Sequence, residues 1–186
     1  MMRFMKSRNT LYLDENVVID GTLTYDGKLA QRITVGPSGN FTTLKGAVDW
    51  FNASATAPTE ILIDGGHFDI TATVEINSVG GYNLNIRGLD SGITYLDVKT
   101  GLENLPMFDV VTPCDFRMMT CDGSTLVGYG DAAGEDCFKF ATTQNLYSEI
   151  SDIIIDTFMV GVNDTIGTEL FCFNFVMDTC QTGIAI

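Results

Sequence analysis

Most of the chain alternates short apolar runs with turns rich in Gly, Asp and Asn, a pattern typical of β-strands. Runs of this kind recur at residues 61–63, 74–76, 84–86, 93–98, 108–111, 116–121, 126–129, 150–155 and 171–176. Each run is too short to form a helix, because a helical pattern needs ten or more periodic residues. The pattern therefore predicts an all-β fold for most of the chain.

One segment has the period of a helix instead. Leu44, Ala47, Val48 and Phe51 are spaced i, i+3, i+4 and i+7, so they share one apolar face. A turn at residues 36–39 and a threonine N-cap precede this face, and a proline follows it. We predict a helix of about three turns at residues 43–52.

The clearest internal repeat aligns residues 153–162 with residues 175–184, an offset of 22. Asp, Thr and Gly recur in place, and five further columns hold apolar or Cys residues in both copies. Met118–Gly123 resembles an earlier copy at an offset of 34, which requires an inserted loop for which 129–145 is the candidate. Repeats of this kind predict coils stacked on one another around a shared core.

Residues 1–31 form a separate segment, which we call the N-terminal arm. Leu11 and Leu13 alternate with polar residues, 17–19 is an apolar strand core, and two Asp-Gly turns give the arm a hairpin-like pattern. Such a segment cannot bury its own apolar face, so it must dock on the helix or on a neighbouring chain. The arm would be an attachment segment, and 32–186 a single β-domain that either continues in a longer parent or is covered by neighbours at its end.

Charge and cysteine content exclude several classes of function. The chain has 186 residues and a formal net charge of −14, of which residues 1–32 carry about +1 and the remainder about −15. A nucleic-acid partner is therefore not expected, because a duplex requires a basic face. The five cysteines show no CxxC pair and there is one histidine, so we expect buried, reduced thiols and neither a zinc site nor another cofactor. No signal peptide or membrane span is evident, which predicts synthesis in a cytosol and no membrane insertion.

The glycine-rich turn, the helix "NFTTLKGAVDWF" and the strand that ends in "DGGHFD" together resemble the start of the pectin-lyase-like right-handed β-helix superfamily. The resemblance covers about residues 33–98, where "LNIRGLDSGITYL" is similar to a second coil. It implies a right-handed parallel β-helix whose first coil is capped by the helix at 43–52. Pectinesterases share this fold with the tailspikes and fibres of bacteriophages.

No catalytic residue can be carried over from the enzymes of this superfamily. Their Gln-containing and Arg-Pro-Trp motifs are not found, and "CDFRMM" is only the nearest match to their Asp motif. We therefore expect a structural or adhesion component of a virus particle, assembled as a homotrimer in a host cytoplasm. Its arm would bind other virion proteins, and its body could bind a host surface glycan. The alternative is a carbohydrate-active enzyme whose site lies on stacked aspartates or outside this chain.

The aspartates concerned are Asp156 and Asp178, with Asp122 as a third. Stacked repeats would place them on adjacent strands about 4.8 Å apart. Carboxylates at such spacing can act as an acid–base pair on glycosides. The other interpretation, which we favour, is that each lies at a turn and hydrogen-bonds local backbone.

Three further features have both a functional and a structural interpretation. His67 could be a general base, but a packed or surface histidine in the turn that closes the first strand is favoured. Trp50 could stack on a sugar, but capping of the core is favoured. Asp131, Glu135 and Asp136 could hold calcium, but they lack the alternating ligands of an EF-hand loop, so a solvated loop is favoured.

Overall fold

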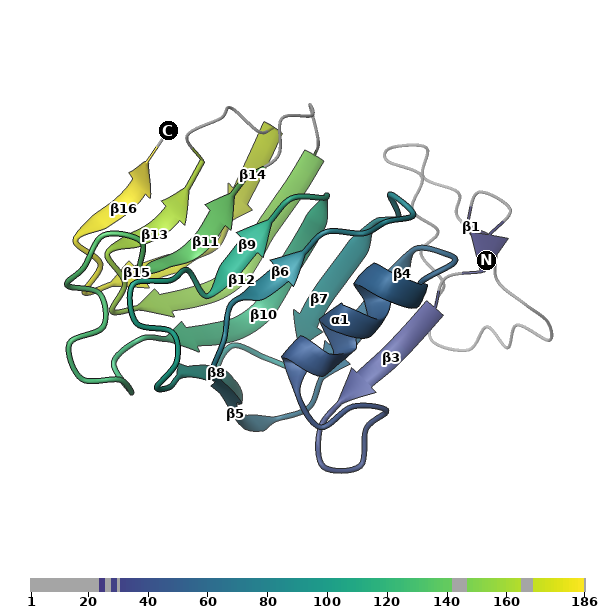
Figure 1. Ribbon diagram of the computed structural model, residues 1–186, viewed down its shortest axis with the longest axis horizontal. Coiled ribbons are helices and arrows are strands. Elements are labelled where there is room, and N and C mark those ends of the chain that lie inside the picture. The colour runs from purple at the N-terminus through teal and green to yellow at the C-terminus, as the bar shows by residue number, and fades with distance from the viewer. Residues whose placement is uncertain (1–23, 26–27, 30, 142–146, 165–168, 186) are drawn as a thin grey trace, which may run out of the picture.

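A computed structural model describes residues 24–25, 28–29, 31–141, 147–164 and 169–185. These residues are predominantly β, with parallel sheets and one short helix, α1 (Figure 1). The all-β expectation is therefore confirmed at the level of fold class. The arm lies almost entirely outside the described residues, apart from an antiparallel pair formed by β1 (Thr24–Tyr25) and β2 (Lys28–Leu29).

The strands from β3 onwards form three rows, and within each row every strand pairs in parallel with the next. Row A contains β3 (Gln31–Val35), β4 (Thr59–Ile63), β7 (Leu84–Gly88), the first halves of β10 (Cys114–Asp122) and β12 (Tyr147–Asp156), and β14 (Glu169–Phe173). Row B contains β5 (Gly66–Ile70), β8 (Thr94–Val98), the second halves of β10 and β12, and β15 (Val176–Asp178). Row C contains β6 (Val74–Ile76), β9 (Phe108–Val110), β11 (Asp136–Phe140), β13 (Val160–Asn163) and β16 (Thr182–Ala185).

The register of these rows confirms both predicted repeats. Asp156 pairs with Asp178 at an offset of 22, and Asp122 pairs with Asp156 at an offset of 34. The inserted loop was placed too late in the sequence. It occupies 123–135, and the second half of the predicted loop contains β11, because Cys137, Phe138 and Phe140 are apolar residues that the core buries.

Single residues with positive φ turn the chain from one row to the next. Met118, Asp152 and Asn174 have φ of 59°, 55° and 46°, and they occupy the same corner between rows A and B at three successive levels of the sheet. Asn174 donates a hydrogen bond to the Asp152 carboxylate at 2.5 Å. Asn and Asp tolerate this left-handed conformation better than other residues with a Cβ. A corner of one residue keeps the strands on both sides in register.

Helix α1 (Leu44–Ser54) confirms the predicted helix at 43–52, but it begins one residue later and ends two residues later. Thr43 caps it, because its hydroxyl accepts a hydrogen bond from the Gly46 amide at 3.2 Å. Its buried face packs mainly on β6, the first strand of row C, as the front of Figure 1 shows. Among the described residues, no helix has the length and apolar character that crossing a bilayer requires.

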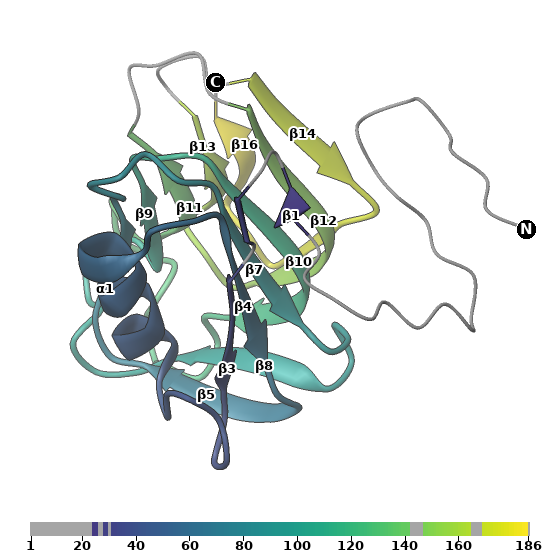
Figure 2. The same cartoon turned by 90° about the vertical axis from the view of Figure 1, so that its right-hand side faces the viewer.

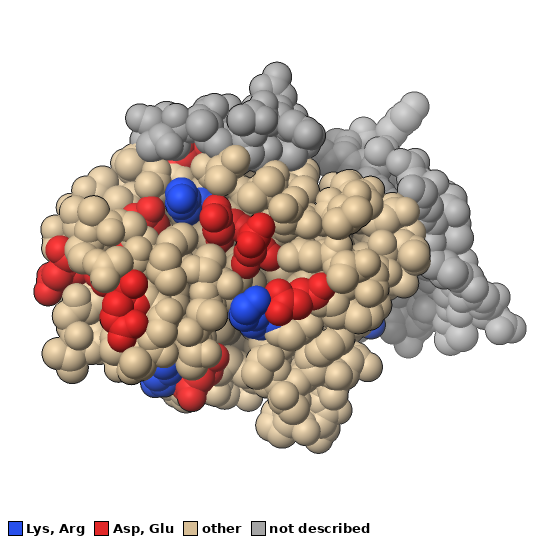
Figure 3. Space-filling model, in the orientation of Figure 1, with Lys and Arg blue, Asp and Glu red and all other residues tan. Residues whose placement is uncertain are grey.

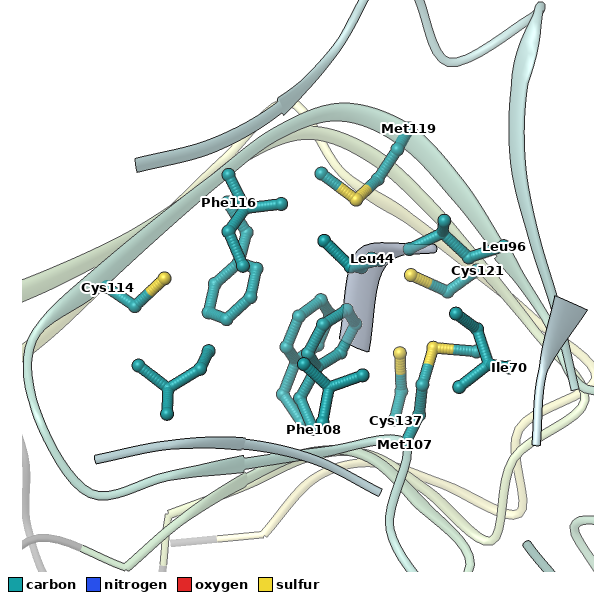
Figure 4. Packing of buried hydrophobic residues seen from close by; sticks show 14 of the residues in the cluster. Leu44, Ile70, Leu96, Met107, Phe108, Cys114, Phe116, Met119, Cys121 and Cys137 are labelled. Carbon is teal, nitrogen blue, oxygen red and sulfur yellow. The ribbon is translucent and has the colours of Figure 1, made fainter. Parts of the chain in front are cut away.

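The core lies between the three rows and is filled by aromatic, aliphatic and sulfur-containing side chains (Figure 4). Phe108 and Phe138, on adjacent strands of row C, stack with ring centroids 5.1 Å apart, and Phe116 meets both edge-on. Cys114, Cys121 and Cys137 are fully buried, as predicted, and no disulfide joins any of the five cysteines. Cys172 and Cys180 are only half-buried, because they lie on the last described coil.

Candidate functional site

The predicted stack of aspartates exists and is longer than the sequence indicated. Asp122, Asp156 and Asp178 pair in register in row B, and the same column continues through Asp97 to Asp69. Five aspartates thus lie on five adjacent strands, about 4.8 Å apart along the sheet. The recurring signal is an apolar residue followed by Asp, which sequence reasoning missed in the first two coils because their offsets differ from 22.

Two carboxylates of this column accept hydrogen bonds from residues of the adjacent turns. Asp156 accepts hydrogen bonds from the hydroxyls of Thr157, at 2.8 Å, and Thr179. Asp122 accepts hydrogen bonds from the amide and hydroxyl of Ser124, at 2.8 and 2.6 Å. These contacts agree with the turn interpretation of the aspartates and not with that of a free acid–base pair.

At the first strands of row B, the column forms a cluster with His67. His67 Nδ1 lies 3.0 and 3.2 Å from the two carboxylate oxygens of Asp97, which is 5% exposed. An ionised carboxylate only accepts hydrogen bonds, so His67 Nδ1 is the donor in this contact. Lys99 Nζ lies 3.6 Å from both Asp97 and Asp69.

His67 was predicted to lie in a turn, and this prediction is wrong. It lies on β5, a strand that the sequence pattern did not reveal, and its ring stacks on Tyr95 of β8 at 4.6 Å and 7°. The turn ends earlier, at Gly65, and Gly66 begins the strand with a φ of 136° that favours glycine. His67 is therefore an exposed, oriented histidine, consistent with the favoured surface interpretation.

A second group of charges lies on the outward side of row C. Glu75, Asp109, Lys139 and Asn163 occupy one column on four adjacent strands. Figure 3 shows acidic and basic side chains interspersed on one face of the molecule. Burial raises the pKa of Asp109, Lys139 partly offsets this, and Glu75 adds to it. The Oδ1 atoms of Asp109 and Asn163 are buried and accept no hydrogen bond from the described residues.

A third group lies on row A. Arg117 reaches Glu149 at 3.2 Å and Asp115 at 3.7 Å. Burial raises the pKa of Asp115, although Arg117 opposes the shift. Beside these charges, Tyr147, Phe171 and Phe173 form an outward stack with centroids 4.8 and 6.3 Å apart.

The acidic loop was expected to be solvated, and this expectation is wrong for two of its three acidic residues, because Glu135 and Asp136 are buried and only Asp131 is exposed. Glu135 is 3% exposed and accepts hydrogen bonds from the amides of Asn104, Gly130 and Ala132. Asp136 is equally buried and accepts one from the Asn163 side chain. These hydrogen bonds to the buried Glu135 carboxylate hold the backbone of the inserted loop in place. In the part of the chain that the structure describes, no three or more His, Cys, Asp or Glu side chains are placed to hold a metal ion.

Trp50 is half-buried against the core and lies 6.2 Å from Phe41, ring centroid to ring centroid. This placement agrees with its interpretation as part of the cap. Comparison of the chain with protein-family models, with curated proteins and with solved structures finds no match in any of the three.

Proposed function

We propose that the chain is a right-handed parallel β-helix that serves as a non-enzymatic structural or adhesion subunit of a virus particle, such as a phage tail fibre, spike or head fibre. The order of the rows supports the fold. Rows A, B and C recur in this order along the chain, and each strand pairs in parallel with the one a coil earlier. Connections between parallel strands of one sheet are right-handed in about 98% of cases, which favours this hand.

The proposed function is supported mainly by the hydrogen bonds that the aspartates of the row B column make. In the enzymatic alternative these carboxylates would act on substrate, whereas Asp122 and Asp156 accept hydrogen bonds from turn residues and Asp97 is buried beside His67. Aspartates that hydrogen-bond turn residues, or that are buried beside another side chain, stabilise a regular stack of coils. A rigid stack with an N-terminal arm suits a subunit that attaches to a particle.

We further propose that the subunit is a homotrimer held by its arms. The arm has apolar strands without a core of its own, and it carries near-neutral charge beside an acidic body. Closed cyclic symmetry would let each arm bury Leu11, Leu13 and 17–19 on a neighbour.

Light scattering on the full chain and on residues 32–186 tests the proposal. We expect a trimer for the full chain, and a folded, mostly monomeric species for the shortened one, with folding checked by circular dichroism. A monomeric full chain, or a shortened chain that stays fully trimeric, would contradict the arm model.

The enzymatic alternative is favoured by one observation outside the aspartate column. Asp109, whose pKa burial raises, pairs with Glu75 on the adjacent strand, and a pair of carboxylates is the usual acid and base of glycoside hydrolysis. Incubation with acidic polysaccharides tests it. We expect no turnover; turnover that Asp109→Asn abolishes would establish an enzyme, whereas Asp156→Asn serves as the control in the other column.

A further inference from the structure

Among the described residues, nothing pairs with the outer edge of the first strand of row B. In row A the first complete coil is preceded by β3, which pairs with β4, and in row C it is covered by α1 on β6. In row B, by contrast, β5 pairs only with β8 among the described residues. Figure 2 shows β5 at the outer edge of its row, below α1.

The backbone of β5 presents hydrogen-bonding groups at this edge. The amide of Gly66 donates to Ile93 at 2.7 Å, and the carbonyl of Ile70 accepts from Lys99 at 3.0 Å, so the even-numbered residues of β5 bond to β8. Successive residues of a strand point their backbone groups to opposite sides in a parallel ladder. The N–H and C=O groups of His67 and Asp69 therefore point away from β8, and open edges of this kind accept further strands.

The core side of β5 is also incompletely covered. Phe68 points inward in the same column as Leu96, Cys121 and Ile155. Those three side chains are fully buried, whereas Phe68 is only half-buried. One more apolar side chain, on a strand paired with β5, would complete the burial of Phe68.

A groove runs along this edge, between β5 and the start of α1. It consists of two adjoining depressions of about 410 and 310 Å³ that share Thr43 and Asp69 in their lining. The half-buried Phe68 provides apolar surface, and His67 and Asp69 project their side chains outward with 65% and 66% exposure. An occupant should thus offer an extended backbone, one inward apolar residue and an outward cation opposite Asp69.

We propose that residues 3–8 of a neighbouring copy of this chain fill the groove as a parallel strand, with Phe4, Met5 and Lys6 opposite His67, Phe68 and Asp69. Phe4 would extend the aromatic stack of His67 and Tyr95, Met5 would cover Phe68, and Lys6 would pair with Asp69. Within the arm, only this triplet places an aromatic, an apolar and a basic residue in succession. The proposal rests on the trimer of the proposed function and specifies where its arms bind.

Zero-length coupling with a carbodiimide tests the register, because it joins an ammonium to a carboxylate in direct contact. We expect dimer and trimer bands on a denaturing gel that contain a Lys6–Asp69 peptide by mass spectrometry. The Lys99–Asp69 pair within one chain is the internal control for coupling, since these groups lie 3.6 Å apart.

Charge reversal provides the matched test in light scattering. Asp69→Lys places like charges together and should weaken assembly by about tenfold, whereas Lys6→Asp combined with Asp69→Lys should restore it. Asp178→Lys is the control, because Asp178 is an exposed aspartate at the other end of the same column.

The outcomes separate this inference from the proposed function. A trimer that Asp69→Lys leaves intact, without a Lys6–Asp69 cross-link between chains, overturns the inference and leaves the trimer standing. A monomeric full chain overturns both. A Lys6–Asp69 cross-link found only within single chains shows that the arm binds its own β5, which also overturns the assignment to a neighbour.

Discussion

At the scale of single residues, the aspartates show how far local environment decides the role of one side-chain type. Asp97 is buried beside His67, Asp156 accepts hydrogen bonds from two threonines, and Asp109 lies between Glu75 and Lys139. All three follow an apolar residue on a strand, so their sequence contexts are alike. The difference arises from the neighbours that adjacent strands supply.

Asp109→Asn should stabilise the protein at pH 7 and have little effect at pH 3. Burial raises the pKa of Asp109 above that of the unfolded chain, so the folded state binds this proton more tightly. The group therefore favours folding below the unfolded pKa, and this contribution is lost as pH rises through the folded pKa. Thermal unfolding of both proteins across this pH range measures the effect. An equal gain at both pH values would show that ionisation is not the cause.

The cysteines should react with a thiol reagent at two different rates. Burial raises the pKa of Cys114 and Cys137 and excludes reagent, whereas Cys172 and Cys180 are only half-buried. In the native protein we expect two thiols to be labelled first and the remainder only on unfolding. Mass spectrometry of time points identifies the sites; early labelling of Cys114 would contradict the described packing.

At the scale of elements, the corners between rows A and B depend on residues that tolerate positive φ. Asn174 and Asp152 suit this conformation, whereas Met118 adopts it with an unfavourable side chain. The corner at Met118 is held in place because Arg117 and Met119 pair with β12 on either side of it. The register of the sheet therefore imposes this conformation on the methionine.

Met118→Asn should accordingly stabilise the protein, by about 1 kcal/mol. The new side chain tolerates the left-handed backbone and can bond to Asp152 in the next coil, as Asn174 does. Urea unfolding gives the free energy. Met119→Asn is the control: Met119 is fully buried, so this substitution should destabilise the fold.

Helix α1 should depend on its buried face more than on helix propensity. Val48→Gly removes a fully buried side chain and lowers helix propensity together, at a cost of about 3 kcal/mol. Ala53→Gly changes propensity at an exposed position of the same helix and should cost about 1 kcal/mol or less. Equal losses in urea unfolding would mean that α1 does not cover the core.

At the scale of the whole molecule, each set of strands from rows A, B and C packs against the sets before and after it. Inward side chains in the middle of row B, such as Leu96, Cys121 and Ile155, are fully buried, whereas Phe68 on the first described strand of this row and Met177 on the last described one are half-buried. Stacks of this kind derive stability from interfaces between neighbouring coils. Stability should therefore fall towards the ends.

A pair of alanine substitutions in one column measures this gradient. Ile155→Ala should cost about 3 kcal/mol because coils on both sides pack against it, and Met177→Ala less than about half of that. Urea unfolding of both variants gives the comparison. Equal costs would indicate that the last coil is as well covered as the fourth.

Features that depend on short-range pattern could be predicted from the sequence. The helical period from Leu44 to Phe51 predicted α1, and matching apolar columns 22 and 34 residues apart predicted which strands pair. Both patterns can be read from the sequence because each position that faces the core must be apolar, whichever residues neighbour it in space. The stack of Asp122, Asp156 and Asp178 followed from the same columns.

Only the tertiary structure decided which polar residues are buried and which lie together. Asp97 meets His67 across 30 residues, and Glu135 folds a loop around its carboxylate, although neither residue stands out from other acidic residues in the sequence. The strands β5 and β11 were missed because they are short and contain charged residues, and pairing with neighbouring strands outweighs their weak local preference. Burial of a polar group depends on partners supplied by other coils, and the spacing of residues within one coil does not contain that information.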